Sequence, residues 1–84
     1  MKKYYVKTNA YDCVMLVDDF GKAYVCYEEI FDEPLTLEVA KNTDYSNFDG
    51  CETAEECAFA IGSNAAMDNI YDFDEDHYES VVEF

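Results

Sequence analysis

The sequence predicts an α+β fold, in which a small antiparallel sheet of three to five strands carries one or two short helices packed on it. Two apolar segments flank a turn at residues 18–21, as in a β-hairpin. A helix-capping sequence at residues 53–56 precedes a helical apolar pattern. Half of the 84 residues are hydrophobic, which is enough for one small core, so we expect residues 1–84 to form a single compact acidic domain.

The hairpin supplies the central strands of the expected sheet. Residues 12–18 are apolar between two charged residues and fit a strand that is buried on both faces. Asp18 suits the first position of a type I turn, and Gly21 suits the left-handed position of a bulge. Residues 23–31 then form the returning strand, and residues 4–8 read as a further short strand.

The segment after the hairpin allows two interpretations. Pro34 ends the returning strand because it has no N–H group to donate to a neighbouring strand. Residues 35–39 alternate in polarity, as a strand does, but Leu35 and Val39 are also spaced as on a helix. Residues 42–50 are rich in turn-forming residues and predict a loop, with Tyr45 and Phe48 packed against the body.

The main helix is expected to begin at a capping box. The Thr53 hydroxyl accepts a hydrogen bond from the Glu56 amide, and Glu56 reaches back towards the start of the helix. Gly62 is suited to end the helix. The apolar residues with helical spacing are Ala54, Cys57, Ala58 and Ile61.

The end of the chain is ambiguous in the sequence. A second short helix is possible from Ser63 or Asn64 to Ile70. Residues 71–84 fit a strand with Tyr78, Val82 and Phe84 on one face. They also fit a helix with Tyr78, Val81 and Val82 on one face.

Charge is the most informative feature of the composition. The chain has 20 acidic residues, five lysines and no arginine, for a formal net charge of −15. Through Lys22 the net charge is +1, and from Ala23 onward it is −16. So much like charge destabilises a compact chain, which indicates a compensating role in binding a basic partner, in binding a cation, or in solubility.

The cysteines and the absence of long apolar runs point to the cytoplasm. The hairpin register places Cys13 near Tyr27 and Cys26 near Val14, on opposite faces, so we expect no disulfide between the two cysteines. The N-terminal residues lead into no apolar segment typical of a signal peptide, so we expect reduced thiols. No apolar run approaches the roughly 20 residues that span a membrane, and the negative charge disfavours anionic membrane surfaces.

One segment has the spacing of a calcium ligand loop. From residue 72 the carboxylates follow the order of an EF-hand loop, but His77 stands where glycine makes the sharp turn, and Glu79 replaces an apolar residue. A solvated acidic face therefore explains the segment better, and a carboxylate calcium-binding module at 72–83 is kept as an alternative. The weak candidate ligands are Asp72, Asp74, Asp76 and Glu83.

Other chemistry is disfavoured by the same composition. Cys51 and Cys57 are six residues apart, and His77 is the single histidine, so a zinc site is not indicated. Few basic neighbours are present to favour a nucleophilic thiolate. No glycine-rich phosphate loop or basic patch is present, so we expect no direct nucleic-acid binding. We therefore expect no enzymatic activity and no cofactor.

The leading hypothesis is a non-enzymatic inhibitor that mimics nucleic acid and occupies the basic groove of a nucleic-acid-binding protein or nuclease. Phages deploy proteins of this physical class against host restriction systems and CRISPR effectors. A close variant is an antitoxin or immunity protein, and another possibility is an acidic accessory domain without mimicry. The chain would act as a monomer or a homodimer.

The hypothesis names two groups of residues that contact the partner. Tyrosines are interleaved with the acidic residues, and tyrosine is enriched at protein interfaces. The aromatic candidates are Tyr45, Tyr71 and Tyr78. The carboxylates, which together we call the acidic surface, are Glu28, Glu29, Asp32, Glu33, Asp49, Glu52, Glu55, Asp72, Asp74, Glu75, Asp76, Glu79 and Glu83.

Overall fold

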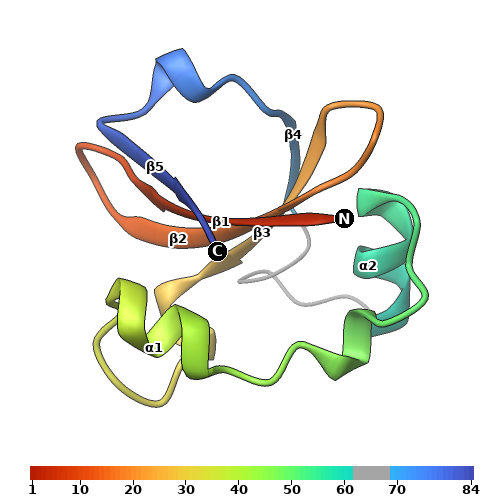
Figure 1. Ribbon diagram of the computed structural model, residues 1–84, viewed down its shortest axis with the longest axis horizontal. Helices are drawn as coiled ribbons and strands as arrows, with labels where there is room; N and C mark the ends of the chain where they lie inside the picture. Colours follow the sequence, from red (N-terminus) through yellow and green to blue (C-terminus); the bar gives the residue numbers. More distant parts are fainter. Residues whose placement is uncertain (62–68) are drawn as a thin grey trace.

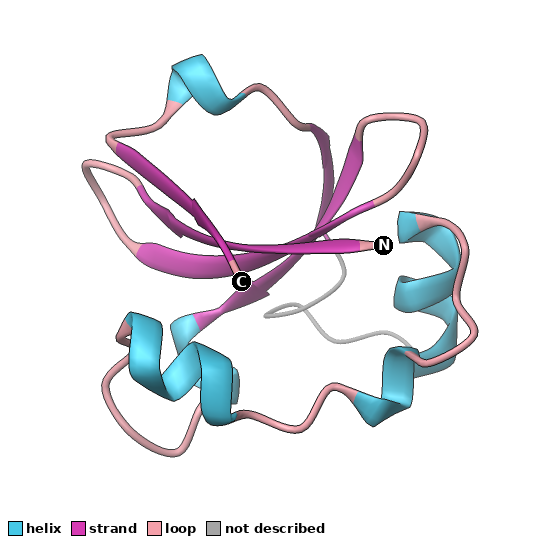
Figure 2. Cartoon of the chain, viewed as in Figure 1, coloured by secondary structure: helices cyan, strands magenta, loops and turns pink. Residues whose placement is uncertain are grey.

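The computed structural model, which describes residues 1–61 and 69–84, has a five-stranded antiparallel sheet with two short α-helices on one side (Figures 1 and 2). The order of strands across the sheet is β4-β3-β2-β1-β5. The α+β prediction is confirmed. The elements are β1 (Lys2–Lys7), β2 (Asp12–Val17), β3 (Lys22–Tyr27), α1 (Leu37–Asn42), α2 (Ala54–Ile61), β4 (Asn69–Asp72) and β5 (Ser80–Glu83), with single 3-10 turns η1 (Glu28–Ile30), η2 (Ser46–Phe48) and η3 (Glu75–His77).

The β2–β3 hairpin has the predicted register. Cys13 lies opposite Tyr27, and Val14 lies opposite Cys26. Gly21 has a φ of +78°, the left-handed conformation that glycine adopts without strain. The returning strand is shorter than the predicted 23–31, because β3 ends at Tyr27. The pairing with β2 stops there, at Cys13 opposite Tyr27, and the chain turns into η1.

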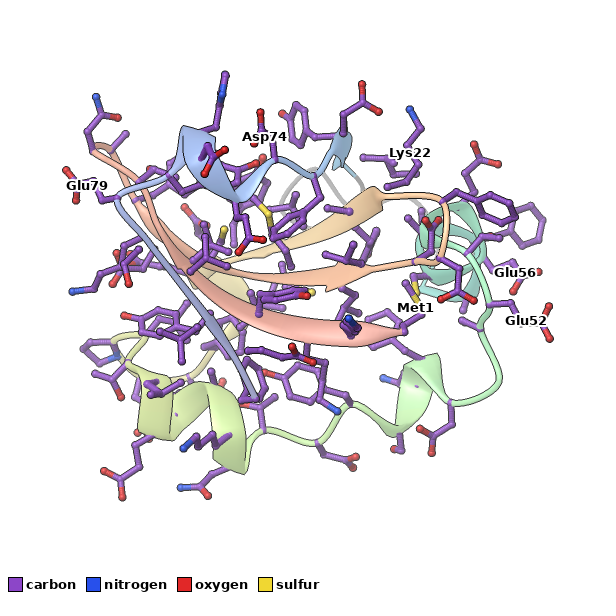
Figure 3. The ribbon with its side chains drawn as sticks, turned by 45° about the horizontal axis from the view of Figure 1, so that its top comes forward. Met1, Lys22, Glu52, Glu56, Asp74 and Glu79 are labelled. Carbon is purple, nitrogen blue, oxygen red and sulfur yellow. The ribbon has the colours of Figure 1, made fainter. Side chains whose placement is uncertain are left out.

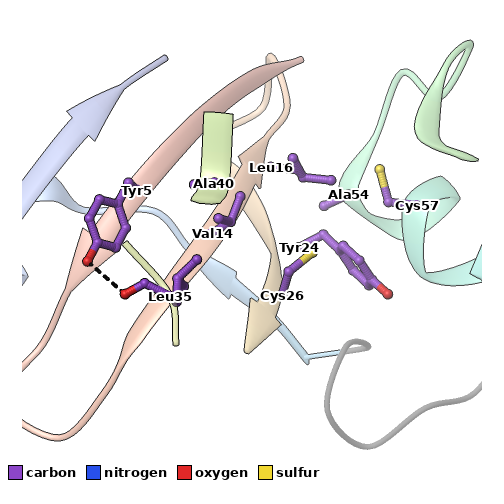
Figure 4. Packing of buried hydrophobic residues seen from close by; sticks show 9 residues of the cluster. All are labelled: Tyr5, Val14, Leu16, Tyr24, Cys26, Leu35, Ala40, Ala54 and Cys57. Atoms are coloured by element: carbon purple, nitrogen blue, oxygen red, sulfur yellow. Dashed lines mark hydrogen bonds between the residues drawn. The ribbon is translucent and has the colours of Figure 1, made fainter. Parts of the chain in front are cut away.

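The central strands are buried on both faces, as predicted for β2. One face packs against the helices and the chain that connects them (Figure 4). On this face the Tyr5 hydroxyl donates to Asp12 Oδ2 at 2.6 Å and also lies 3.5 Å from the carbonyl oxygen of Leu35. The opposite face is covered by the segment that joins β4 to β5. Its buried residues are Val6, Cys13, Met15, Val17, Ala23 and Val25.

Helix α1 begins at Leu37, so the strand interpretation of residues 35–39 is wrong. The Thr36 hydroxyl accepts the Val39 amide at 3.2 Å and caps α1. Leu35 and Ala40 are buried in the core on one face of the sheet, and Leu37 and Val39 pack against that core, so this segment covers the sheet instead of extending it. The predicted contacts of the following loop are confirmed: the Phe48 ring lies 5.6 Å from that of Tyr24, and the Tyr45 hydroxyl donates to an α1 carbonyl.

Helix α2 begins where the capping box predicts. The Thr53 hydroxyl accepts the Glu56 amide at 3.1 Å. The Glu56 carboxylate reaches one residue further back than in a standard capping box and accepts the Glu52 amide at 2.6 Å. A third cap comes from the hairpin turn, because Asp18 Oδ2 accepts the Ala54 amide at 2.9 Å. The sequence pattern does not reveal this long-range contact.

The rest of the predicted C-terminal region is only partly described. Gly62 and the start of the possible second helix lie outside the described residues. Its predicted end is wrong, because Ile70 belongs to strand β4. The helical interpretation of 71–84 is also wrong, since η3 and β5 form there.

Strand β5 distributes the last apolar residues over both faces of the sheet. Val82 lies opposite Tyr5 on the helix side, and Phe84 packs on that side too. Tyr78 precedes the strand and packs on the opposite side with Val81. The prediction that Tyr78 shares a face with Val82 and Phe84 is therefore wrong, because β5 begins only at Ser80.

The Thr53 cap gives a stability prediction. Thr53→Ala removes the hydroxyl that accepts the Glu56 amide and is expected to cost about 1 kcal/mol of folding free energy. Urea unfolding followed by circular dichroism measures the change. Thr53→Ser keeps the hydroxyl and is the matched control, which we expect to unfold like the wild type. Equal loss in both variants would show that the methyl group, not the cap, stabilises the helix start.

Candidate partner-binding surface

The segment 73–79 joins the two edges of the sheet and presents a row of carboxylates on its outer side (Figure 3). Its apolar side packs inward: the Phe73 ring stacks on Tyr4 with centroids 4.8 Å apart. Backbone hydrogen bonds anchor both ends, from Phe73 N–H to the hairpin turn at 2.8 Å and from Glu79 N–H to Lys7 O at 2.9 Å. Asp74 caps η3 by accepting the Asp76 amide at 3.1 Å. The acidic row is therefore attached to the core at several points.

Every carboxylate of the acidic surface is exposed to solvent. Between described residues, the ion pairs are Lys22 with Asp72 and the contact of His77 with Asp74, 3.7 Å between nitrogen and oxygen. The hydrogen bond and charge of Asp72 raise the pKa of Lys22. Most of the negative charge on the described surface thus lacks a compensating cation within the chain.

A groove lies between η1 and α1, with a volume of about 620 Å³. Asp32 and Glu33 of the acidic surface line it together with Glu38 and Asp44. Backbone and then side-chain hydrogen bonds from Ser46 lower the pKa of Asp44. The sequence analysis missed Glu38 as a site residue, because the position of Glu38 depends on residues 37–42 being helical rather than extended.

The three predicted aromatic residues differ in exposure. Tyr71 is 48% exposed. Tyr45 and Tyr78 are half-buried and contribute to packing: the Tyr45 ring lies 6.1 Å from Phe84, and the Tyr78 ring lies 6.1 Å from Phe73. Their role in partner binding stays a prediction.

Two phenylalanines that the sequence analysis did not single out are far more exposed. Phe20, in the hairpin turn, is 79% exposed, and Phe59, on α2, is 90% exposed. Phe59 could have been found from the sequence, since it falls off the apolar stripe formed by Ala54, Cys57 and Ala58. Soluble proteins expose single apolar residues often, but two nearly bare phenylalanine rings on a highly charged surface are suited to protein contact.

The candidate calcium ligands do not converge. Asp72 ends β4 and Glu83 lies in β5, which are the two opposite edges of the sheet. In the described part of the chain, no group of three histidine, cysteine, aspartate or glutamate side chains is placed to hold a metal ion.

The buried thiols are poorly suited to act as nucleophiles. Burial raises the pKa of Cys13, Cys26 and Cys57 to about 12 in each case. A thiol is nucleophilic as the thiolate, so these groups are almost fully protonated and unreactive near neutral pH.

Known proteins give no guide to function. No family model matches the chain, and no curated protein or solved structure is significantly similar to it. Among the described residues, no helix combines the length and apolarity needed to cross a membrane.

Proposed function

We propose that this protein is a non-enzymatic inhibitor that mimics nucleic acid and occupies the basic groove of a nucleic-acid-binding protein or nuclease. The observation that supports the proposal most is the exposure of the whole acidic surface with few compensating cations among the described residues. Such a field attracts a basic partner over a Debye length and raises the rate of encounter.

The acidic row on segment 73–79 is held as a fixed array of charge. Glu75 and Asp76 belong to the 3-10 turn η3, which Asp74 caps. Because segment 73–79 is tied to the sheet at both ends, little conformational entropy is lost when it binds.

The exposed phenylalanines add a second kind of contact. A protein that binds nucleic acid bases offers flat apolar surfaces on which the bases stack. Phe20 and Phe59 present rings of suitable size beside carboxylates, and the Asp18 contact with Ala54 connects the hairpin turn to α2. We propose that these rings occupy base-binding positions while the carboxylates occupy phosphate-binding positions.

The four cysteines are free, which supports a reducing compartment such as the cytoplasm. Anti-restriction and anti-CRISPR proteins belong to the functional class proposed, and an antitoxin that plugs a basic toxin is its nearest variant.

Competition with DNA tests the proposal. Fluorescently labelled double-stranded DNA is bound to each member of a panel of restriction nucleases, CRISPR effectors and basic DNA-binding proteins, and the protein is added while anisotropy is recorded. We expect stoichiometric displacement from at least one member. An unfolded polyglutamate peptide of the same net charge is the control. If no member releases DNA, or if polyglutamate displaces it equally well, the proposal is wrong.

A further inference from the structure

Three sulfur atoms come together beside the start of α2. The Cys57 thiol donates to Met1 Sδ, with the two sulfurs 3.3 Å apart, and the neighbouring Cys51 is among the groups that raise the Cys57 pKa. Figure 3 shows Met1 next to α2, and Figure 4 shows Cys57 on the core side of that helix. The three residues come from the strand end, the loop and the helix, so the fold rather than local sequence assembles the cluster.

The capping interactions of α2 hold this arrangement in place. The Glu56 carboxylate accepts the Glu52 amide, which ties the chain after Cys51 back onto the helix. The Cys51 amide in turn donates to Phe48 O at 3.1 Å. These bonds hold the backbone of Cys51 near the start of α2, and both cysteines are free thiols.

Two thiols and a thioether form a donor set for a soft cation. Cysteine and methionine sulfurs together favour Cu(I), whereas zinc prefers four ligands drawn from cysteine, histidine and carboxylates. Calcium and magnesium prefer oxygen ligands, whereas all three ligands proposed here are sulfur atoms. The ligand chemistry therefore selects a soft monovalent metal.

The site opens to solvent on the side of Met1 and Cys51, whereas Cys57 is fully buried. Met1 is 43% exposed, Cys51 is half-buried, and a cavity of about 200 Å³ lined by both opens next to them. Three sulfurs around a metal at bond lengths of about 2.3 Å lie about 4 Å apart. The 3.3 Å separation of Met1 and Cys57 must open slightly, which the flexible Met1 side chain allows.

We propose that Met1, Cys51 and Cys57 form a three-sulfur site for one Cu(I) ion. On binding, the metal displaces the proton of each cysteine thiol to solvent and forms a thiolate–metal bond, including at Cys57, which is protonated in the metal-free protein. The Met1 thioether donates a lone pair without losing a proton. The site is independent of the acidic surface, and inhibition of a partner is not needed to test it.

Competition with a chromophoric Cu(I) chelator under anaerobic reducing conditions measures this binding. We expect one Cu(I) per chain, and a loss of affinity of at least about 100-fold in Cys51→Ser and in Cys57→Ser, since removing a ligand costs more than removing a residue that merely supports one. Cys13→Ala is the matched control, because it leaves the same number of thiols as Cys51→Ser or Cys57→Ser. Cys13 lies on the other face of the sheet, so this variant should bind Cu(I) like the wild type.

Met1→Leu, made by cleaving a fusion immediately before residue 1, isolates the thioether. X-ray absorption spectroscopy should then count two sulfur ligands instead of three. Thermal melts check that each variant folds. Cys51→Ser should disturb the fold less than Cys57→Ser, because Cys51 is half-buried and Cys57 is fully buried. If Cys51→Ser binds Cu(I) as tightly as the wild type, if Cys13→Ala weakens binding equally, or if Zn(II) binds at one equivalent and Cu(I) does not, the site is not the one proposed.

Discussion

Replacing Asp18 with alanine is expected to destabilise the fold by about 2–4 kcal/mol, because a buried carboxylate and its hydrogen bonds are lost together. Asp18 is 8% exposed. One carboxylate oxygen accepts the amides of Phe20 and Lys22, each at 2.9 Å. The other accepts the Ala54 amide and so connects the hairpin turn to the first residue of α2.

Urea unfolding at neutral pH measures the loss. Asp19→Ala is the matched control. Asp19 is the exposed neighbour in the same turn, and it takes part in none of the hydrogen bonds that Asp18 accepts. We expect Asp19→Ala to change stability by less than about 0.5 kcal/mol. Equal effects in the two variants would mean that turn composition, not the long-range cap, stabilises this corner of the molecule.

The same carboxylate makes stability depend on pH in a defined direction. Burial raises the pKa of Asp18, but the amide hydrogen bonds from Ala54, Lys22 and Phe20 outweigh it, so the net pKa is lowered. Stability from a lowered pKa is fully present above the unfolded value of about 3.9 and is lost as the pH falls through the folded value.

Asp18→Asn tests this linkage because it removes the titrating group. Its amide nitrogen cannot accept a hydrogen bond, so one of the Asp18 contacts is lost at neutral pH. We expect the stability difference between wild type and Asp18→Asn to be largest above about pH 5 and to shrink towards pH 2. A difference that stays constant from pH 6 to pH 3 would contradict a lowered pKa at Asp18.

Local patterns in the sequence predict the parts of the fold that local physics determines. The left-handed Gly21 fixes the hairpin length and hence the opposition of Cys13 with Tyr27. The Thr53 hydroxyl and the Glu56 amide are three residues apart, so the helix start is visible in the sequence. The short segment 35–39 was ambiguous because five residues satisfy both periodicities, and the packing of α1 on the sheet, a tertiary contact, decides between them.

Long-range contacts account for what the sequence did not show. Asp18 reads as a turn residue, and its bond to Ala54, 36 positions away, depends on how the helix packs against the sheet. The placement of β4 and β5 at opposite edges separates Asp72 from Glu83, which linear spacing had grouped as candidate ligands. The meeting of Met1 with Cys57 likewise spans 56 positions. Of the candidate surface, charge and exposure were predictable, while the groove and the bare Phe20 ring were not.

Charge reversal on segment 73–79 is expected to slow association with the partner by about ten-fold or more at low salt, because electrostatic steering raises association rates by about 10–1,000-fold. The sequence alone points to Asp72, Asp74 and Asp76. The structure favours a different triple, since Asp72 pairs with Lys22 and Asp74 caps η3. Reversing the charge of Asp72 or Asp74 would disturb the fold as well as the electrostatic field of the acidic surface.

The preferred variant therefore changes Glu75, Asp76 and Glu79 to lysine, which shifts the formal net charge from −15 to −9, two units for each reversal. The control for position within the acidic surface reverses three of its other exposed carboxylates, Glu28, Glu29 and Glu33, and has the same net charge. Association with the panel member that releases DNA is followed by stopped-flow fluorescence.

We expect the 75/76/79 variant to associate more slowly than the control at low salt, and the two to converge near 1 M salt, where the Debye length falls to about 3 Å. Dissociation rates should change less, because exposed charges act mainly on encounter. Rates that are equal for both variants would mean that net charge alone steers the partner. Rates that are independent of salt would mean that apolar contacts such as Phe20 and Phe59 dominate recognition and that the acidic row does not bind.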